Sequence, residues 1–402
     1  MFRLSSAPMP FDSARIPSDV DALSPVLLDV SAKIHAHPEL RFEEHRAAAW
    51  LTEAVEARGI QVERGTGGMP TSFRARVGEG GPRIAILAEY DALPEIGHAC
   101  GHNLIASGAL GAFLALAEQR ASLPGTIELI GTPAEEGGGG KIKLIGAGVF
   151  EGVDAAMMFH PFDRDLLAHH TLAAMWIDMV FRGTPSHAAI APWDGASALT
   201  ACMQTFHLID AQRVHFRDGV RVHGYIKDGG QAVNVIPERA ACELSVRALD
   251  QKELARVRGI VERCARGAAM ACGVTVEIQP RPGYKDIVNN MAVARRFGDH
   301  LRATGRTPAD HDSEVGAGST DMGDVSHVVP SIHPWIAICD RNETTCHQRA
   351  FAACAGSERG QKGMLAAAKA MALTAADLVT DPALLQAAKA EFAARKAHEK
   401  SA

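Results

Sequence analysis

Apolar residues recur at helical spacing in the first part of the chain. Within residues 18–34, and again within 44–57, they return every three or four positions, which is the period of one face of an α-helix. The second stretch is followed by Gly59, a residue suited to the left-handed end of a helix. We therefore predict two helices, the first with an apolar face formed by Val20, Leu23, Val26, Leu27 and Val30.

Short runs that are apolar throughout follow these helices. The run at 84–87 is bounded by turn residues, and similar runs occur in TIELIG, AAMMFHPF and PWIAICD (334–340). Helical stretches such as NLIASGALGAFLALAEQ separate them. Continuous apolar runs of this length are typical of strands buried on both faces, and strands that alternate with helices favour a parallel sheet. The pattern predicts an α/β domain whose mainly parallel sheet is flanked by helices.

The middle of the chain has a different pattern. The longer stretches AAMWIDMVFRGTPSH, VRVHGYIKDGG and ACELSVRALD alternate apolar and polar residues, as strands with one solvated face do. Helical spacing returns over 196–211 and 251–271. We predict an inserted α+β domain at 172–288. It would divide the α/β domain into a first segment, 1–171, and a second segment, 289–402.

Composition narrows the classes of function. Of the 402 residues, 47% are hydrophobic and 22% are charged, and the net charge is −6. This balance gives no basis for binding nucleic acid or an anionic membrane. The chain shows no run of about 18 consecutive apolar residues, no secretory signal at its start and no disulfide-framework spacing among its eight cysteines. We expect a cytoplasmic protein without nucleic-acid or membrane partners that acts on a small or peptide-like substrate.

Polar residues suited to binding metal follow the predicted buried strands. The carboxyl ends of parallel strands border the crevice where α/β proteins hold their ligands. The segment GHACGHN, just after the first strand, adds a cysteine and a histidine two residues apart. We therefore expect side chains from four segments to converge: Asp91, Cys100, His102, Glu135, Glu136, His160 and His347.

These residue types leave two kinds of chemistry open. Cys100 beside His98 or His102 could be a nucleophile with its base. Cysteine, histidine and glutamate are also zinc ligands, and imidazole with carboxylate suits manganese. In the metal interpretation, one of Glu135 and Glu136 binds the ion while the other takes a proton from water. No GxSxG motif is present in the sequence, which removes the commonest serine-hydrolase interpretation.

Eight short motifs occur in one fixed order: HAHPELRFEE, DALPEIGHACGHN, GTPAEEGGGG, FHP, GTPSHAA, NVIP, GSTDMGDVSH and TTCHQRAF. Together they resemble the co-catalytic metallopeptidase family of aminoacylases, carboxypeptidase G, auxin-conjugate amidohydrolases and aminobenzoyl-glutamate hydrolases. The resemblance extends from Ile34 to Phe351. The segment EYDALPEIGHACGHN is most similar to the branch that holds aminobenzoyl-glutamate hydrolases and dipeptidases for β-alanyl-lysine-type peptides.

The resemblance implies a role for each matched residue. Glu135 matches the general base. Asp91 matches an acid that supports a metal ligand by a hydrogen bond without binding the metal itself. His187 matches a lid histidine that reaches a neighbouring subunit's active site and stabilises an oxyanion. Asn234 and Arg247 match lid positions that bind a substrate carboxylate. The metal ligands are matched by Cys100, His102, Glu136, His160 and His347.

The resemblance also implies cofactors and an assembly. It implies one or two divalent ions, zinc or manganese, in a catalytic domain whose inserted lid commonly forms a homodimer. Two positions depart from the family pattern. Many relatives have a histidine ligand where this chain has Glu89, and the cysteine-containing branch often has aspartate where this chain has Asn103. The number of ions and the roles of Glu89 and His98 stay open.

The resulting expectation is a metal-dependent amidohydrolase for an N-acyl amino acid, a dipeptide or an aminobenzoyl-glutamate-like substrate. Glu135 would take a proton from the attacking water and return it to the leaving amine. Three alternatives are kept. The same site could deaminate an electron-poor aromatic amine, Cys100 could be a nucleophile, or the chain could be a catalytically silent protein that binds amino-acid conjugates.

Overall fold

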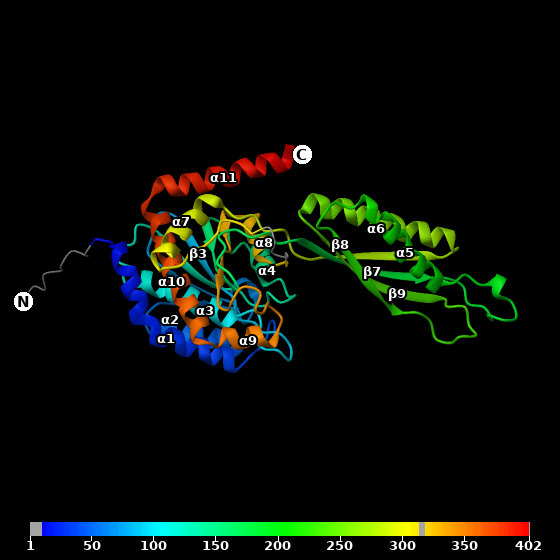
Figure 1. The fold of residues 1–402 in the computed structure, drawn as a ribbon, viewed down its shortest axis with the longest axis horizontal. Coiled ribbons are helices and arrows are strands. Elements are labelled where there is room, and N and C mark those ends of the chain that lie inside the picture. The colour runs from blue at the N-terminus through cyan, green and yellow to red at the C-terminus, as the bar shows by residue number, and fades with distance from the viewer. Residues whose placement is uncertain (1–9, 313–317, 402) are drawn as a thin grey trace, which may run out of the picture. The chain divides into compact units, whose positions relative to one another are not determined.

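The computed structural model describes residues 10–312 and 318–401. These residues form two compact units, of which the first contains 10–169, 288–312 and 324–401 and the second contains 170–287 and 318–323. The chain therefore leaves the first unit and returns to it, as the change from green to orange and red shows (Figure 1). Residues 1–9, at the start of the segment on which the secretion argument rests, lie outside the described residues.

A six-stranded sheet in the order β1-β2-β4-β3-β5-β11 is the centre of the first unit. β3 is parallel to β4 and β5, and β11 is parallel to β5, whereas β1 and β2 join antiparallel at one edge. The predicted α/β class with a mainly parallel sheet is confirmed, although the sequence pattern did not identify β1 and β2. The strands are β1 (Val62–Arg64), β2 (Phe73–Val77), β3 (Arg83–Ala88), β4 (Thr126–Gly131), β5 (Ala155–Met157) and β11 (Ser331–Ile332).

Helices cover this sheet with their apolar sides. α3 (His102–Ala117) is buried along its whole length and packs on β3, on α1 (Ile16–Ala36) and on α10 (Glu358–Thr380). By length and composition α10 could span a membrane, with a mean hydropathy of 1.3 in its most apolar window, but 67% of that window is buried inside the protein. A helix in the core of a protein can have the same length and hydropathy, and α10 packs on α3, α7 and α1 as such a helix does. The other helices that belong wholly to this unit are α2 (His45–Glu56), α4 (Gly140–Gly146), α7 (Met291–Ala303), α9 (Arg349–Ala355) and α11 (Pro382–Ser401).

The strand predicted at 334–340 is not part of the main sheet, which corrects that expectation. β11 pairs with β5, whereas β12 (Trp335–Ala337) pairs with β6 (His160–Phe162) in a separate two-stranded sheet. Pro334 has no N–H group, so the ladder is interrupted at that residue. Its carbonyl still accepts a hydrogen bond of 2.9 Å from the His160 N–H. His160 therefore lies at the point where pairing passes from the main sheet to the two-stranded sheet.

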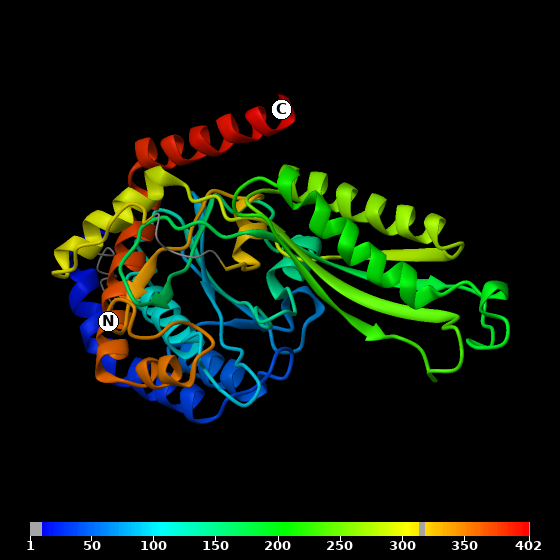
Figure 2. The same cartoon turned by 45° about the vertical axis from the view of Figure 1, so that its right-hand side comes forward.

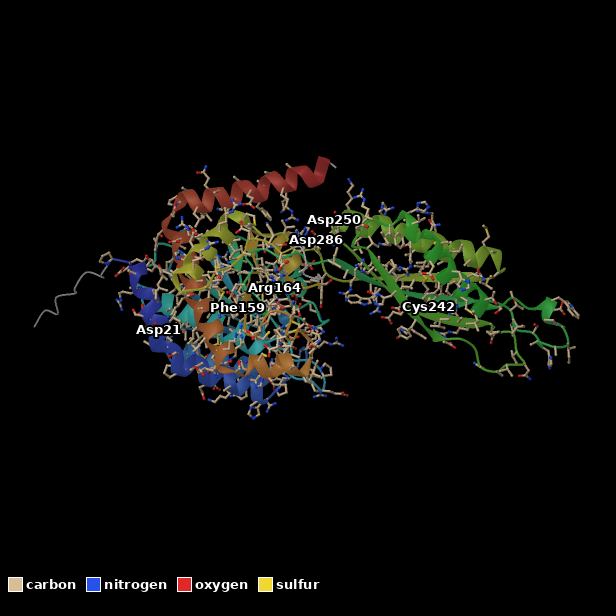
Figure 3. The ribbon with its side chains drawn as sticks, viewed as in Figure 1. Asp21, Phe159, Arg164, Cys242, Asp250 and Asp286 are labelled. Carbon is tan, nitrogen blue, oxygen red and sulfur yellow. The ribbon has the colours of Figure 1, made fainter. Side chains whose placement is uncertain are left out.

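The second unit is a four-stranded antiparallel sheet in the order β10-β7-β9-β8, with two helices on one face (Figure 2). Cys242, labelled in Figure 3, lies in its core, where its thiol contacts that of Cys202. β8 is an edge strand of this sheet. The elements are β7 (Ala173–Arg182), α5 (Ala198–Gln212), β8 (Arg221–Asp228), β9 (Arg239–Ala248), α6 (Gln251–Ala271) and β10 (Thr275–Pro282), and α8 (Met322–Ser326) carries the chain back to the first unit.

Candidate metal centre

Three parallel strands deliver polar side chains to one edge of the main sheet. Glu89 and Asp91 follow β3, Glu135 and Glu136 follow β4, and His160 follows β5. Because the three strands are parallel, their carboxyl ends lie at the same edge. The sheet therefore gathers four carboxylates and an imidazole from segments that are far apart in the sequence.

The loop between β3 and α3 adds Cys100 and His102. Gly97 and Gly101 have φ angles of 63° and 74°, a left-handed conformation that glycine adopts without steric cost. A Cβ at Gly101 would approach the Pro161 ring to 2.9 Å, so this loop passes close to the segment that carries His160. Cys100 and His102 are both buried, and His102 is the first residue of α3.

Asp91 orients two of the predicted ligands. Its Oδ1 lies 3.0 Å from Nδ1 of His102, and its Oδ2 accepts a hydrogen bond of 2.9 Å from the Glu136 N–H. Burial favours the neutral acid, but the charge and hydrogen bond of His102 outweigh burial and lower the pKa of Asp91. Because Asp91 engages Nδ1, the Nε2 atom of His102 is the one that can face a cation.

Two overlapping groups of donor atoms meet at Cys100. Its Sγ, a ring nitrogen of His102 and a carboxylate oxygen of Glu136 all lie within 4.8 Å of one another. Its Sγ also forms a group of the same size with a ring nitrogen of His160 and with Sγ of Cys346. Four of the predicted ligands therefore form one cluster, and Cys346 joins it.

His347 reaches the same cluster from the loop before α9. Its Nε2 lies 3.4 Å from Oε1 of Glu136, and its own N–H donates a hydrogen bond of 2.9 Å to the Ala99 carbonyl. Two ligands of one tetrahedral zinc ion, each about 2.1 Å from the metal, are separated by roughly 3.4 Å. The spacing of His347 and Glu136 is thus suited to a shared ion.

The cluster contains buried polar atoms that have no hydrogen-bond partner within the described part of the chain. They are Nε2 of His102, Oε1 of Glu136 and Oε2 of Glu89. Such atoms are costly in a folded protein unless a ligand or ion satisfies them. The donor set of thiol, imidazole and carboxylate matches zinc and tolerates manganese. These residues therefore fit a divalent cation.

Glu89 occupies the position at which the family pattern has a histidine. Its Oε1 forms an ion pair with Lys141, and its Oε2 lies 3.4 Å from Nε2 of His102. Both partners of the ion pair are fully buried. Lys141 ends the glycine run of GTPAEEGGGGK, so this run brings an internal cation to Glu89. An ion pair of this kind holds its charges in the interior only while both partners are present.

The turn that carries Glu135 is held by a second buried acid, Glu44. Ala134 has a φ of 61°, and its N–H donates a hydrogen bond of 2.8 Å to Oε1 of Glu44. Oε2 of Glu44 accepts another of 2.8 Å from the Thr71 hydroxyl. Burial, aided by the charge of Asp91, raises the pKa of Glu44 to about 7. Beyond this turn, Oε2 of Glu135 lies 4.0 Å from Nε2 of His102.

The geometry does not support Cys100 as a nucleophile paired with His98. Both ring nitrogens of His98 are buried without a hydrogen-bond partner among the described residues. Burial lowers the pKa of His98 to about 3, which keeps it neutral. The hydrogen bond to Cys346, together with burial, raises the pKa of the Cys100 thiol well above its ordinary value. A reactive thiolate needs the opposite shift.

Besides Lys141 and Glu44, sequence reasoning missed Cys346 and His333 in this region. His333 is buried, and its ring centroid lies 5.5 Å from that of His160. Burial also lowers the pKa of His333 well below its ordinary range. A signal existed for each residue: Cys346 directly precedes the predicted ligand His347, and a His–Pro pair occurs at both 160–161 and 333–334.

The three remaining predicted residues lie in the second unit. His187 is exposed, and the Ala188 N–H after it donates a hydrogen bond of 2.9 Å to the Asn234 carbonyl, so His187 and Asn234 are neighbours. Arg247 lies in β9, opposite Ala174 of β7. The roles that the resemblance implies for these residues stay predictions.

Comparison with known proteins supports the same chemistry. Residues 85–376 match the model of peptidase family M20/M25/M40. The chain is 37% identical to a mouse Xaa-Arg dipeptidase over 96% of this chain and 94% of that protein. It is 30% identical to one subunit of the p-aminobenzoyl-glutamate hydrolase of Escherichia coli K12, over 90% and 91% of the two chains.

A solved structure has the same fold. The YXEP protein of Bacillus subtilis, a dinuclear metal-binding peptidase, superposes with a TM-score of 0.70 at 22% identity and covers 90% of this chain and 99% of its own. The family match and the sequence relatives confirm the expectation of a metal-dependent hydrolase that acts on C–N bonds. The chain belongs to the M20/M25/M40 family of peptidases.

Proposed function

We propose that this protein hydrolyses the amide bond of a dipeptide or N-acyl amino acid that ends in a free carboxylate. The observation that carries the proposal is the position of Glu135. It directly precedes the candidate ligand Glu136, lies 4.0 Å from His102 and is almost fully buried. A carboxylate in this position can take a proton from a water and later release it to the leaving amine.

The chain's own residues prepare this proton transfer. A divalent ion held by these residues would supply positive charge to polarise the scissile carbonyl and acidify water. Asp91 holds His102 and the Glu136 backbone in place, and Glu44 holds the turn before Glu135. Because most of these groups are buried, their electrostatic interactions are stronger than they would be in water.

We propose zinc as the ion, because Cys100 supplies a soft sulfur ligand, with manganese as the alternative. The donor atoms of Cys100, His102 and Glu136 support one ion. His347, next to Glu136, and His160, next to Cys100, offer further donor atoms for a second ion. One or two ions are therefore both compatible with this donor set.

The substrate class we favour is a dipeptide with a C-terminal basic residue. The support is the mouse relative, whose name is Xaa-Arg dipeptidase and which matches almost the whole chain. An aminobenzoyl-glutamate substrate is the second candidate, supported by the E. coli relative. In either case Asn234 and Arg247 would bind the free carboxylate of the substrate.

We further propose a cytoplasmic homodimer formed through the second unit, in which His187 serves the neighbouring subunit's active site. Among the described residues, every exposed large hydrophobic side chain except Leu40 lies in this unit. They include Ile190 and Trp193, close in sequence to His187, and an exposed apolar surface favours a protein interface. All eight cysteines are free thiols, which supports a reducing compartment.

Elemental analysis of the purified protein, followed by assays with and without a chelator, tests the proposal. The substrates are Xaa-Arg and β-alanyl-lysine dipeptides, aminobenzoyl-glutamate, N-acetyl amino acids and an aminonitrobenzoate. We expect one or two bound ions per chain and chelator-sensitive release of a free amino acid. Release of ammonia from the aminonitrobenzoate alone would favour deamination instead. Absence of bound metal, with no rescue by zinc or manganese, would refute the metal mechanism and favour a silent binding protein.

A further inference from the structure

Cys346 lies beside the metal cluster within the motif TTCHQRAF, and the proposed mechanism gives it no role. Its Sγ lies within 4.8 Å of Cys100 Sγ and of a ring nitrogen of His160, and the two thiols are hydrogen-bonded. Cys100 is buried and Cys346 is half-buried. Two sulfurs and an imidazole that converge from three segments form a typical set of zinc ligands.

The position of Cys346 is fixed by backbone contacts between two loops. The N–H of His347 donates to the Ala99 carbonyl at 2.9 Å, which brings Cys346, the residue before His347, near Cys100, the residue after Ala99. Arg349 donates a hydrogen bond of 2.8 Å to the Glu95 carbonyl and joins the same loops a second time. Cys346 therefore faces Cys100 because the two loops are held together, and not through a mobile side chain alone.

We propose that Cys346 is a further metal ligand, which together with Cys100 and His160 forms a sulfur-rich position that binds zinc in preference to manganese. This inference rests on the metal centre of the proposed function. As each sulfur–metal bond forms, the thiol gives its proton to the solvent, so both cysteines bind as thiolates. Thiolates are soft ligands that suit zinc far better than they suit manganese, which favours oxygen ligands.

Cobalt substitution tests the number of sulfur ligands without measuring activity. The full-length protein is stripped of metal under reducing conditions and loaded with Co²⁺, and the sulfur-to-cobalt charge-transfer absorption in the near ultraviolet is compared between variants. C346S and C346A should each lose about half of the wild-type absorption, since one of two thiolates is gone. C354S, which changes a partly buried thiol outside the cluster, is the matched control and should retain all of it.

Metal competition provides the second measurement. Dialysis of each protein against equal concentrations of Zn²⁺ and Mn²⁺ gives the ratio of the bound ions by elemental analysis. We expect the preference of wild-type protein for zinc to fall by about 10-fold or more in C346S and C346A. The C354S variant should keep the wild-type ratio.

The outcomes separate failure of this inference from failure of the proposed function. If C346S and C346A keep full cobalt absorption and the wild-type metal ratio, Cys346 is not a ligand, although the metal centre stands. If wild-type protein binds no cobalt, zinc or manganese, the metal centre itself is refuted. Thermal unfolding of the metal-free variants shows whether they fold, and the alanine and serine variants must agree for the inference to hold.

Discussion

Glu135 and Glu136 are neighbours in the chain, but their surroundings differ. The backbone of Glu136 is tied to Asp91, and its carboxylate lies among the cluster of Cys100 and His102. Glu135 is also buried, its Oε2 lies 4.0 Å from Nε2 of His102, and it is not part of the donor group that Glu136 forms with Cys100 and His102. The side chains of adjacent residues in irregular backbone point in different directions. Glu136 can therefore bind an ion while Glu135 accepts and releases a proton.

The first prediction separates these two roles. Glu135→Gln should lower kcat by roughly 10²–10⁴-fold, because an amide cannot accept the proton from water. Its zinc content should stay at the wild-type value. Glu136→Gln, the matched variant at the next position, should instead lose zinc. Elemental analysis beside steady-state kinetics tests both. If zinc were lost from Glu135→Gln in proportion to activity, Glu135 would be a ligand.

Glu44 gives a prediction about pH. Its pKa of about 7 in the folded protein, against 4.5 for the ordinary side chain, means that the folded state holds this proton more tightly than the unfolded state. The stability from this group is therefore complete below pH 4.5 and is lost as pH rises through 7. The whole change amounts to about 3 kcal/mol.

Glu44→Gln should remove this dependence, since glutamine has the shape of the protonated acid. The free energy of unfolding, measured with urea between pH 5 and pH 8, should fall with pH in wild-type protein relative to the variant. Other titrating groups cancel in this difference. Parallel curves for the two proteins would show that Glu44 does not titrate in this range.

At the scale of elements, α3 connects the core with the metal centre. Its first residue is the candidate ligand His102, and Gly108 lies about two turns further along the same helix. A Cβ at Gly108 would approach Phe159 to 2.5 Å, and Phe159, labelled in Figure 3, directly precedes His160. The absence of a side chain at Gly108 thus allows the helix and this histidine segment to pack closely.

Gly108→Ala should therefore destabilise the protein although alanine favours helices. We expect a loss of about 1–3 kcal/mol from overpacking, together with weaker zinc binding because His160 is displaced. Gly267→Ala is the matched control in α6, where a Cβ would meet nothing within 4 Å, and it should stabilise by up to about 1 kcal/mol. Thermal unfolding with zinc titration measures both effects. Equal effects of the two substitutions would contradict this account of Gly108.

At the scale of the whole molecule, the two units differ in what their surfaces offer. In the second unit, β8 is an edge strand, and most of its residues are exposed, including Tyr225 and Ile226. Exposed edge strands with apolar side chains tend to pair with another chain. This supports the proposal that the homodimer forms through this unit.

Tyr225→Lys should therefore shift the protein from dimer to monomer, since a charge at the pairing edge would be buried on association. Sedimentation equilibrium gives the mass directly. Val214→Lys is the control: Val214 is also exposed, at 81%, but lies outside the strands of the sheet. A wild-type monomer, or a dimer that persists in Tyr225→Lys, would contradict assembly through β8.

The order of elements could be predicted because their signals are local. Continuous apolar runs marked β3, β4 and β5, and helical spacing marked α1, α2 and α6. β2, by contrast, is a short antiparallel strand that the alternation of helices and strands did not indicate. The break at Pro334 was also missed, since an apolar run does not show where a proline interrupts pairing.

The sequence by itself determined the family, the α/β class and the chemistry of metal-dependent hydrolysis, because motifs and hydrophobic patterns are formed by residues close together in the chain. Only the tertiary structure decided which other side chains lie in the site beside the predicted residues. The contacts of Cys346 with Cys100, of Lys141 with Glu89 and of Glu44 with the Glu135 turn join segments far apart in the chain. The hydrophobic pattern along the chain does not predict such contacts, because they form only when the ends of the parallel strands and the loops after them pack together.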